Sequence, residues 1–275
     1  MRIPVLASLL GLSLFACAGN ITGGGDDDVP ENCGNGVVDE GEECDGSESC
    51  TATCTEDPTA TPRLDASVDK PTTTSQLMKD VTVTATLTSA ANFAGPVAIA
   101  ATVVDDANTP LPLITVAGPT TVDLTAGQSA PATFTVTIPS NATGTAMTAN
   151  LKLAITSSAG NHDLTTAIAI EPTLIIAYPA GSGANIGAHS VGAGLVPAMI
   201  TIKRGTMVGY KNDDTVRHVT HGDNGLDHEN DGDPTTGAPG ATYLQPTIAI
   251  APGGNTPAFG CHTHGSATYV NFTIE

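Results

Sequence analysis

Strict alternation of apolar residues with threonine is the feature that most constrains the fold of this chain. Between positions 81 and 88, an apolar side chain occupies every odd position and threonine occupies every even one. The same period of two returns over 133–138, and apolar residues recur at alternate positions over 151–155. Successive side chains point to opposite faces in an extended strand, so these segments predict β-strands with one buried and one hydroxylated face.

Turn-forming clusters such as DDANTP and AGPTT separate these strands over residues 64–172. They leave room for seven or eight strands in about 110 residues, which is the spacing of an immunoglobulin-like β-sandwich. We therefore expect an all-β chain whose middle part is an immunoglobulin-like sandwich.

The charge balance excludes two classes of ligand. The chain has 9 Lys and Arg against 28 Asp and Glu, which gives a formal net charge of −19. Nucleic acids and anionic membrane surfaces both require a basic face, so neither is expected to be a ligand. Aromatic residues make up only 3% of the chain, which argues against platforms for stacking bases or sugars.

The N-terminus has the pattern of an export signal over residues 1–16. One basic residue and an apolar stretch lead to Leu14-Phe15-Ala16-Cys17, which resembles a bacterial lipobox. The resemblance implies that Cys17 is acylated and anchors the chain to a membrane without spanning it. We therefore expect a lipid-anchored protein of the cell envelope, at the outer membrane or the cell surface.

An acidic tether and a cysteine-rich module follow the anchor. Residues 17–32 are Gly-rich and acidic, and residues 33–54 contain four cysteines, Cys33, Cys44, Cys50 and Cys54. In an exported protein, four closely spaced cysteines predict two disulfides in one of three connectivities, with a zinc site as the competing interpretation. A Pro/Thr-rich linker covers residues 55–63.

The cysteine-rich module contains the runs Cys33-Gly34-Asn35-Gly36 and Asp39-x-Gly41-Glu42-Glu43-Cys44-Asp45. This pattern is similar to the cysteine-rich repeat of myxobacterial surface proteins. The resemblance implies a surface spacer.

The candidate chemistry lies in residues 173–275, which hold six of the seven histidines and Cys261. An odd thiol in an exported protein is a liability unless it forms a dimer disulfide, is a nucleophile or binds a metal. No helix signal that would favour a nucleophile lies near Cys261. One thiolate near several imidazoles is a donor set that selects copper, with zinc as the usual competitor.

Two segments of this region form a specific pattern. The first runs from Leu195 through Gly205-Thr206 and Tyr210-x-Asn212-x-Asp214 to His218, and the second is Phe259-Gly260-Cys261-His262-Thr263-His264-Gly265. Together they resemble the plastocyanin-like cupredoxin family. The resemblance implies a Greek-key cupredoxin sandwich over 173–275. It also implies one copper ion held by His218, Cys261 and His264, and a redox partner protein such as a basic cytochrome.

The sequence departs from this family at the weak axial ligand. The family places a methionine after the second histidine ligand with two or four residues between them, where this chain has Ala267 or Tyr269. Met199 and Met207 lie on earlier predicted strands, and we expect them to be core residues.

The remaining histidines are expected away from the copper ligands. Strand periodicity turns His221 to the opposite surface from His218, and it turns His262 away from the site of Cys261. We expect His189 and His228 to be exposed, although one of them could be an extra ligand in an atypical site.

A weak calcium motif completes the candidate sites. Asp227-x-Glu229-x-Asp231-Gly232-Asp233 has the alternating carboxylates of a calcium loop, but Ala238 stands where the bidentate glutamate is required. A solvated acidic loop is the favoured interpretation.

These observations favour a surface-anchored copper protein that carries single electrons and is not a catalyst. Copper capture or storage is the first alternative. A structural or adhesive lipoprotein whose terminal sandwich has lost its metal is the second.

Overall fold

The structure is a computed structural model that describes residues 51, 61–184, 190–191, 194–195, 199–230, 232–254, 256–262 and 269–275. The chain divides into two units, Met1–Thr55 and Glu56–Glu275, and all the strands below belong to the second. The predicted signal, the lipid site at Cys17, the tether and the four cysteines between 33 and 54 lie outside the described residues. Among the described residues, no helix is long and apolar enough to cross a membrane.

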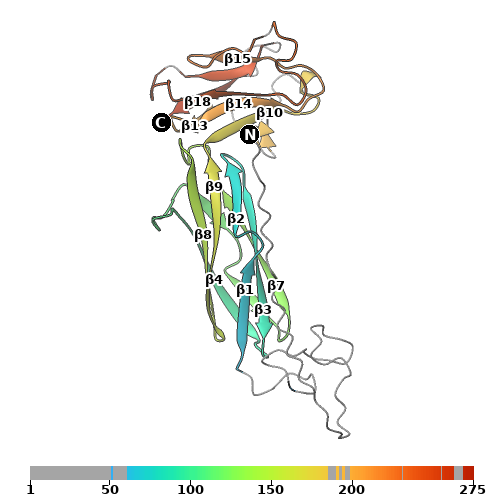
Figure 1. Ribbon diagram of the computed structural model, residues 1–275, viewed down its shortest axis with the longest axis vertical. Coiled ribbons are helices and arrows are strands. Elements are labelled where there is room, and N and C mark those ends of the chain that lie inside the picture. The colour runs from blue at the N-terminus through green and yellow to red at the C-terminus, as the bar shows by residue number, and fades with distance from the viewer. Residues whose placement is uncertain are drawn as a thin grey trace, which may run out of the picture. The chain divides into compact units, whose positions relative to one another are not determined.

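Residues 61–171 form a sandwich of two sheets (Figure 1). Its strands are β1 (Arg63–Val68), β2 (Thr72–Gln76), β3 (Val81–Ala90), β4 (Gly95–Val104), β5 (Thr115–Ala117), β6 (Thr121–Leu124), β7 (Ser129–Thr137), β8 (Met147–Ser157) and β9 (Gly160–Glu171). One sheet has the order β1-β3-β7-β5 and the other β2-β9-β8-β4-β6. Strands β2 and β9 pair in parallel, and the other pairs in these sheets are antiparallel.

The predicted alternation is what builds this sandwich. In β3, the apolar residues at odd positions are buried and the threonines at even positions are exposed or half-buried. Phe134 and Leu151 meet in the same core from β7 and β8, each at 1% exposure or less. Burying one such side chain contributes about 1.5–3 kcal/mol, so the register of each strand is strongly fixed.

The structure has nine strands in this region where seven or eight were expected. The difference arises at β5 and β6, which have 3 and 4 residues and flank the predicted turn AGPTT. Strands this short carry too few alternations to be distinguished from a turn by periodicity.

A second sandwich follows (Figure 1). Its elements are β10 (Thr173–Tyr178), the 3-10 turn η1 (Ser182–Ala184), β11 (Ser190–Val191), β12 (Gly194–Leu195), β13 (Met199–Ile202), β14 (Met207–Asn212), β15 (Thr220–Asp223), β16 (Thr242–Pro246), β17 (Ala258–Cys261) and β18 (Val270–Ile274). The sheets have the orders β12-β11-β10-β14-β16 and β13-β18-β17-β15. Parallel pairing joins β10 to β14 and β13 to β18.

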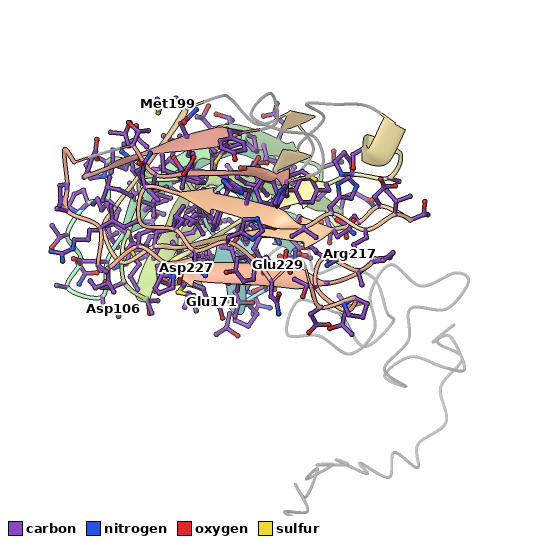
Figure 2. All side chains as sticks on the ribbon, turned by 90° about the horizontal axis from the view of Figure 1, so that it is seen from above. Asp106, Glu171, Met199, Arg217, Asp227 and Glu229 are labelled. Atoms are coloured by element: carbon purple, nitrogen blue, oxygen red, sulfur yellow. The ribbon has the colours of Figure 1, made fainter. Side chains whose placement is uncertain are left out.

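The prediction of an all-β fold with two consecutive sandwiches is confirmed for the described residues. The expectation that Met199 is a core residue is wrong, because its side chain is 51% exposed at the outside of the molecule (Figure 2). Met199 begins the edge strand β13, whose inward positions are taken by Ile200 and Ile202. Met207, on β14, is half-buried.

Candidate metal centre

Strand pairing brings His218 and Cys261 together although 43 positions separate them in the sequence. Thr220 of β15 lies opposite Cys261 of β17, and His218 stands two residues before Thr220. The period of two therefore directs His218 to the same inner face as Cys261. The His218 Nδ1 atom is 3.5 Å from the Cys261 Sγ atom, and the two residues are 1% and 0% exposed.

Asp214 fixes which nitrogen of His218 faces the thiol. The Nε2 atom of His218 lies 3.0 Å from the Asp214 Oδ2 atom and 3.2 Å from the Ser182 hydroxyl. A carboxylate accepts hydrogen bonds, so Nε2 carries the proton and the Nδ1 lone pair faces Cys261. This arrangement, in which a carboxylate orients an imidazole, is typical of histidines that bind metals.

The Asp214 carboxylate is itself held by the backbone around η1. Its oxygens accept hydrogen bonds from the amides of Gly181, Gly183 and Thr215 at 2.7–2.8 Å. The hydrogen bond with His218, followed by that from Gly181, holds the pKa of this carboxyl well below its usual range. Asp214 therefore stays ionised and remains an acceptor for the His218 proton.

Asn212 fixes the loop that joins β14 to His218. Its side-chain amide donates to the carbonyl oxygens of Val216 and Gly237, both at 2.7 Å. Its side-chain oxygen accepts a hydrogen bond from the amide of Asp214 at 2.9 Å. The carbonyl of Gly237 also accepts from the backbone amide of His218 at 2.9 Å, so one carbonyl joins Asn212 to the candidate ligand.

Aromatic rings support the other side of His218. The ring of Tyr178 stacks on His218 with centroids 4.6 Å apart, and Tyr210 stacks on Tyr178 at 4.3 Å. Burial raises the pKa of Tyr178 and Tyr210 well above the usual value, so both phenols stay neutral. The imidazole is thus positioned by a carboxylate at its edge and by an uncharged ring on its face.

The separation between the two donors fits a single bound ion. Nitrogen and sulfur ligands at about 2.0–2.1 Å and 2.3 Å from one ion lie roughly 3.5–3.8 Å apart at tetrahedral to trigonal angles. The 3.5 Å between the two atoms lies at the lower end of this range. An imidazole with a thiolate suits copper or zinc.

The other predicted ligand positions are only partly described. His264, Ala267 and His189 lie outside the described residues. Tyr269, at one of the two positions considered for the axial ligand, stacks against His221 with ring centroids 5.6 Å apart. The Tyr269 ring also lies over Gly260, the residue before Cys261. It therefore covers the face of β17 opposite the thiol.

The acidic segment 227–233 differs from the expected solvated loop. Glu229 is only 7% exposed, and its carboxylate accepts a hydrogen bond from the Thr220 amide at 2.9 Å. Asp233 accepts hydrogen bonds from the amide and hydroxyl of Thr235. Asp231 lies outside the described residues. These two carboxylates support the local backbone, so the segment is partly a structural element of the second sandwich.

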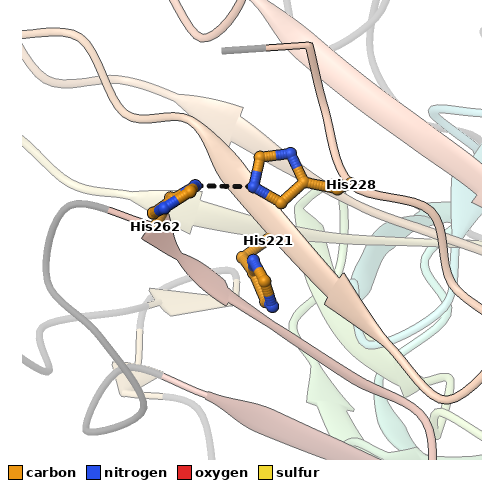
Figure 3. Close-up of side chains that lie close together, drawn as sticks. All are labelled: His221, His228 and His262. Atoms are coloured by element: carbon orange, nitrogen blue, oxygen red, sulfur yellow. Dashed lines mark hydrogen bonds between the residues drawn. The ribbon is translucent and has the colours of Figure 1, made fainter.

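Sequence reasoning missed a group of three histidines. His221, His228 and His262 lie together on the surface opposite Cys261, and one nitrogen of each is within 4.8 Å of the others (Figure 3). The period of two predicted, for His221 and for His262 separately, that each side chain lies on the strand face away from the copper ligands. Only the register, which sets His221 opposite Gly260, shows that they are neighbours.

Comparisons with known proteins give weak similarities only. No family model and no curated protein matches the sequence. A purple cupredoxin from Nitrosopumilus maritimus is similar over 37% of this chain and 99% of its own, with 19% identity and a TM-score of 0.27. A FixG-related protein from Vibrio parahaemolyticus is similar over 41% and 98%, with 9% identity and a TM-score of 0.29.

A family 123 glycoside hydrolase from Clostridium perfringens is similar over 39% of this chain, with 9% identity and a TM-score of 0.34. The matched part is 27% of the hydrolase, so the chain spans about a quarter of that enzyme. Similarities at these TM-scores carry no argument about function, which rests on the side chains of the candidate site.

Proposed function

We propose that the second sandwich binds one copper ion through His218, Cys261 and His264 and transfers single electrons. The observation that carries the proposal is the orientation of His218, whose Nδ1 atom faces the Cys261 Sγ atom at 3.5 Å while Asp214 holds Nε2. A copper ion bound by these residues would supply a one-electron couple between Cu(I) and Cu(II).

The residues of the chain contribute rigidity and exclusion of water. His218 and Cys261 are buried, and both belong to or adjoin paired strands of one sheet. Asp214 and Tyr178 hold the imidazole in a fixed orientation. Donors that do not move between oxidation states keep the reorganisation energy low, which favours electron transfer over catalysis at the ion.

The proposal extends to the cellular setting. The net charge of −19 favours a redox partner with a basic face, such as a basic cytochrome. Acylation at Cys17 would hold the protein at the cell envelope, and the tether and the cysteine-rich module would separate the sandwiches from the membrane.

The test is the optical spectrum of the purified chain after addition of copper(II). A thiolate bound to copper gives an intense visible charge-transfer band, which we expect in the wild type and in His162→Gln, a control on β9. The band should be absent in Cys261→Ser. Voltammetry should then show a reversible one-electron wave. Copper binding by the wild type without this band would refute the proposal.

A further inference from the structure

The group formed by His221, His228 and His262, called here the outer histidine cluster, plays no part in the site described above. His221 belongs to β15, His228 to the segment after it, and His262 directly follows β17 (Figure 3). The rings meet edge to face, with centroids 4.8 Å apart for His221 and His228 and 4.7 Å apart for His228 and His262. Three imidazoles in mutual contact are unusual on a chain with only seven histidines.

His228 is held so that its other nitrogen faces the cluster. Its Nδ1 atom donates a hydrogen bond to the backbone carbonyl of Glu229. A carbonyl can only accept, so the neutral ring has its lone pair on Nε2. That Nε2 atom accepts a hydrogen bond from the Nδ1 atom of His262 at 2.6 Å, and a bound ion would replace this proton. The same backbone contact orients many histidines that bind metals.

His221 contributes an independent sign of a ligand. Its Nδ1 atom is buried and has no hydrogen-bond partner among the described residues. Burying an imidazole nitrogen without a partner is unfavourable, and coordination of an ion would remove this cost. Tyr269 stacks on the same ring and fixes its plane.

The spacing of the nitrogens fits one ion. Imidazole nitrogens around a tetrahedral ion lie about 3.3 Å apart. The nitrogen-to-nitrogen distances in the cluster lie on both sides of this value: the His228 and His262 nitrogens are 2.6 Å apart, and no pair of ligand nitrogens is more than 4.8 Å apart. Rotation of the exposed His262 side chain would change its distances to the other two imidazoles.

We propose that the outer histidine cluster is a second metal site, which binds one Zn²⁺ or Cu²⁺ ion through three imidazole nitrogens and no sulfur. Neutral imidazole suits both ions, and the acidic chain attracts cations of either kind. The site lies on the opposite face of β17 from Cys261, although His262 is the next residue in the sequence. The exposed His262 lets this ion exchange with solvent, whereas His218 and Cys261 are buried.

The experiment is a zinc titration of the full chain that carries Cys261→Ser, with binding measured by isothermal titration calorimetry. We expect one ion to bind, and His228→Gln added to this background should weaken binding at least about tenfold, because one of three ligands is lost. His262→Gln should do the same at an exposed position, where misfolding cannot explain the loss. His162→Gln, on β9 of the first sandwich, is the matched control and should change nothing.

Copper(II) gives a second readout in the same variants. Electron paramagnetic resonance of the Cys261→Ser chain should show a tetragonal signal with nitrogen hyperfine structure, which His228→Gln removes. Zinc affinity that stays within twofold in both histidine variants would overturn the proposal, as would a Cys261→Ser chain that binds no zinc. These results test the outer histidine cluster alone. The proposed electron-transfer function is tested separately, by the charge-transfer band that requires Cys261.

Discussion

Replacing Asn212 by alanine tests whether the loop before His218 is fixed as the structure indicates. The substitution removes three hydrogen bonds, two donated to the carbonyls of Val216 and Gly237 and one accepted from the amide of Asp214. The carbonyl of Gly237 keeps the bond from the His218 amide, so it is not left without a donor.

The expected cost follows from these bonds. A hydrogen bond contributes about 0.5–1.5 kcal/mol net, and a buried group left without a partner costs about 1–3 kcal/mol. Asn212 is 2% exposed, so water does not easily replace the lost partners. We therefore expect Asn212→Ala to lower the free energy of unfolding by about 2–3 kcal/mol. We also expect copper affinity to fall about 10- to 100-fold, because the loop that orients His218 is loosened.

Urea denaturation of the metal-free protein measures the first effect, and competition with a copper chelator measures the second. Asn161→Ala, at an exposed position of β9, is the matched control and should stay within about 0.5 kcal/mol of the wild type. An Asn212→Ala protein as stable as this control, with unchanged copper affinity, would refute the role assigned to the loop.

Three further results are expected. Asp214→Asn should lower copper affinity about 10- to 100-fold, because an amide that donates to His218 Nε2 would shift the imidazole proton to Nδ1. Competition with a copper chelator measures this affinity. The control Asp213→Asn, at the exposed neighbouring position, should leave copper affinity unchanged. Gly260→Ala should destabilise the fold by about 1–3 kcal/mol in urea, because a Cβ atom there would overlap the Tyr269 ring, and a stability equal to wild type would contradict the packing. Alkylation of the denatured, unreduced mature protein should count one thiol, that of the buried Cys261, and a count of zero would mean that this cysteine is paired.

The sequence was sufficient for the fold class because threonine alternates with apolar residues so regularly. In β3, the odd positions are buried and the even ones are not, as the pattern requires. Prediction failed where periodicity is short or ambiguous. Met199 is apolar but lies at the outward position of an edge strand, and nothing in a four-residue strand indicates which face is covered.

The sequence suggested the candidate donors but not the residues that support them. The motif Tyr210-x-Asn212-x-Asp214 pointed to a cupredoxin-like segment, and the structure assigns a contact to each of its residues. Tyr210 supports the ring that stacks on His218, Asn212 fixes the loop and Asp214 orients the imidazole. These contacts depend on a loop closing onto η1, about 30 residues earlier in the chain, and no local pattern encodes that closure.

The proposed function requires that His218 and Cys261 bind the same copper ion. X-ray absorption at the copper edge identifies the ligands, with one equivalent of copper in a His228→Gln chain so that the outer histidine cluster does not compete. We expect one sulfur scatterer together with imidazole nitrogens, and loss of the sulfur in Cys261→Ser. A first shell of nitrogen and oxygen alone in the chain that retains Cys261 would show that the thiolate is not a copper ligand.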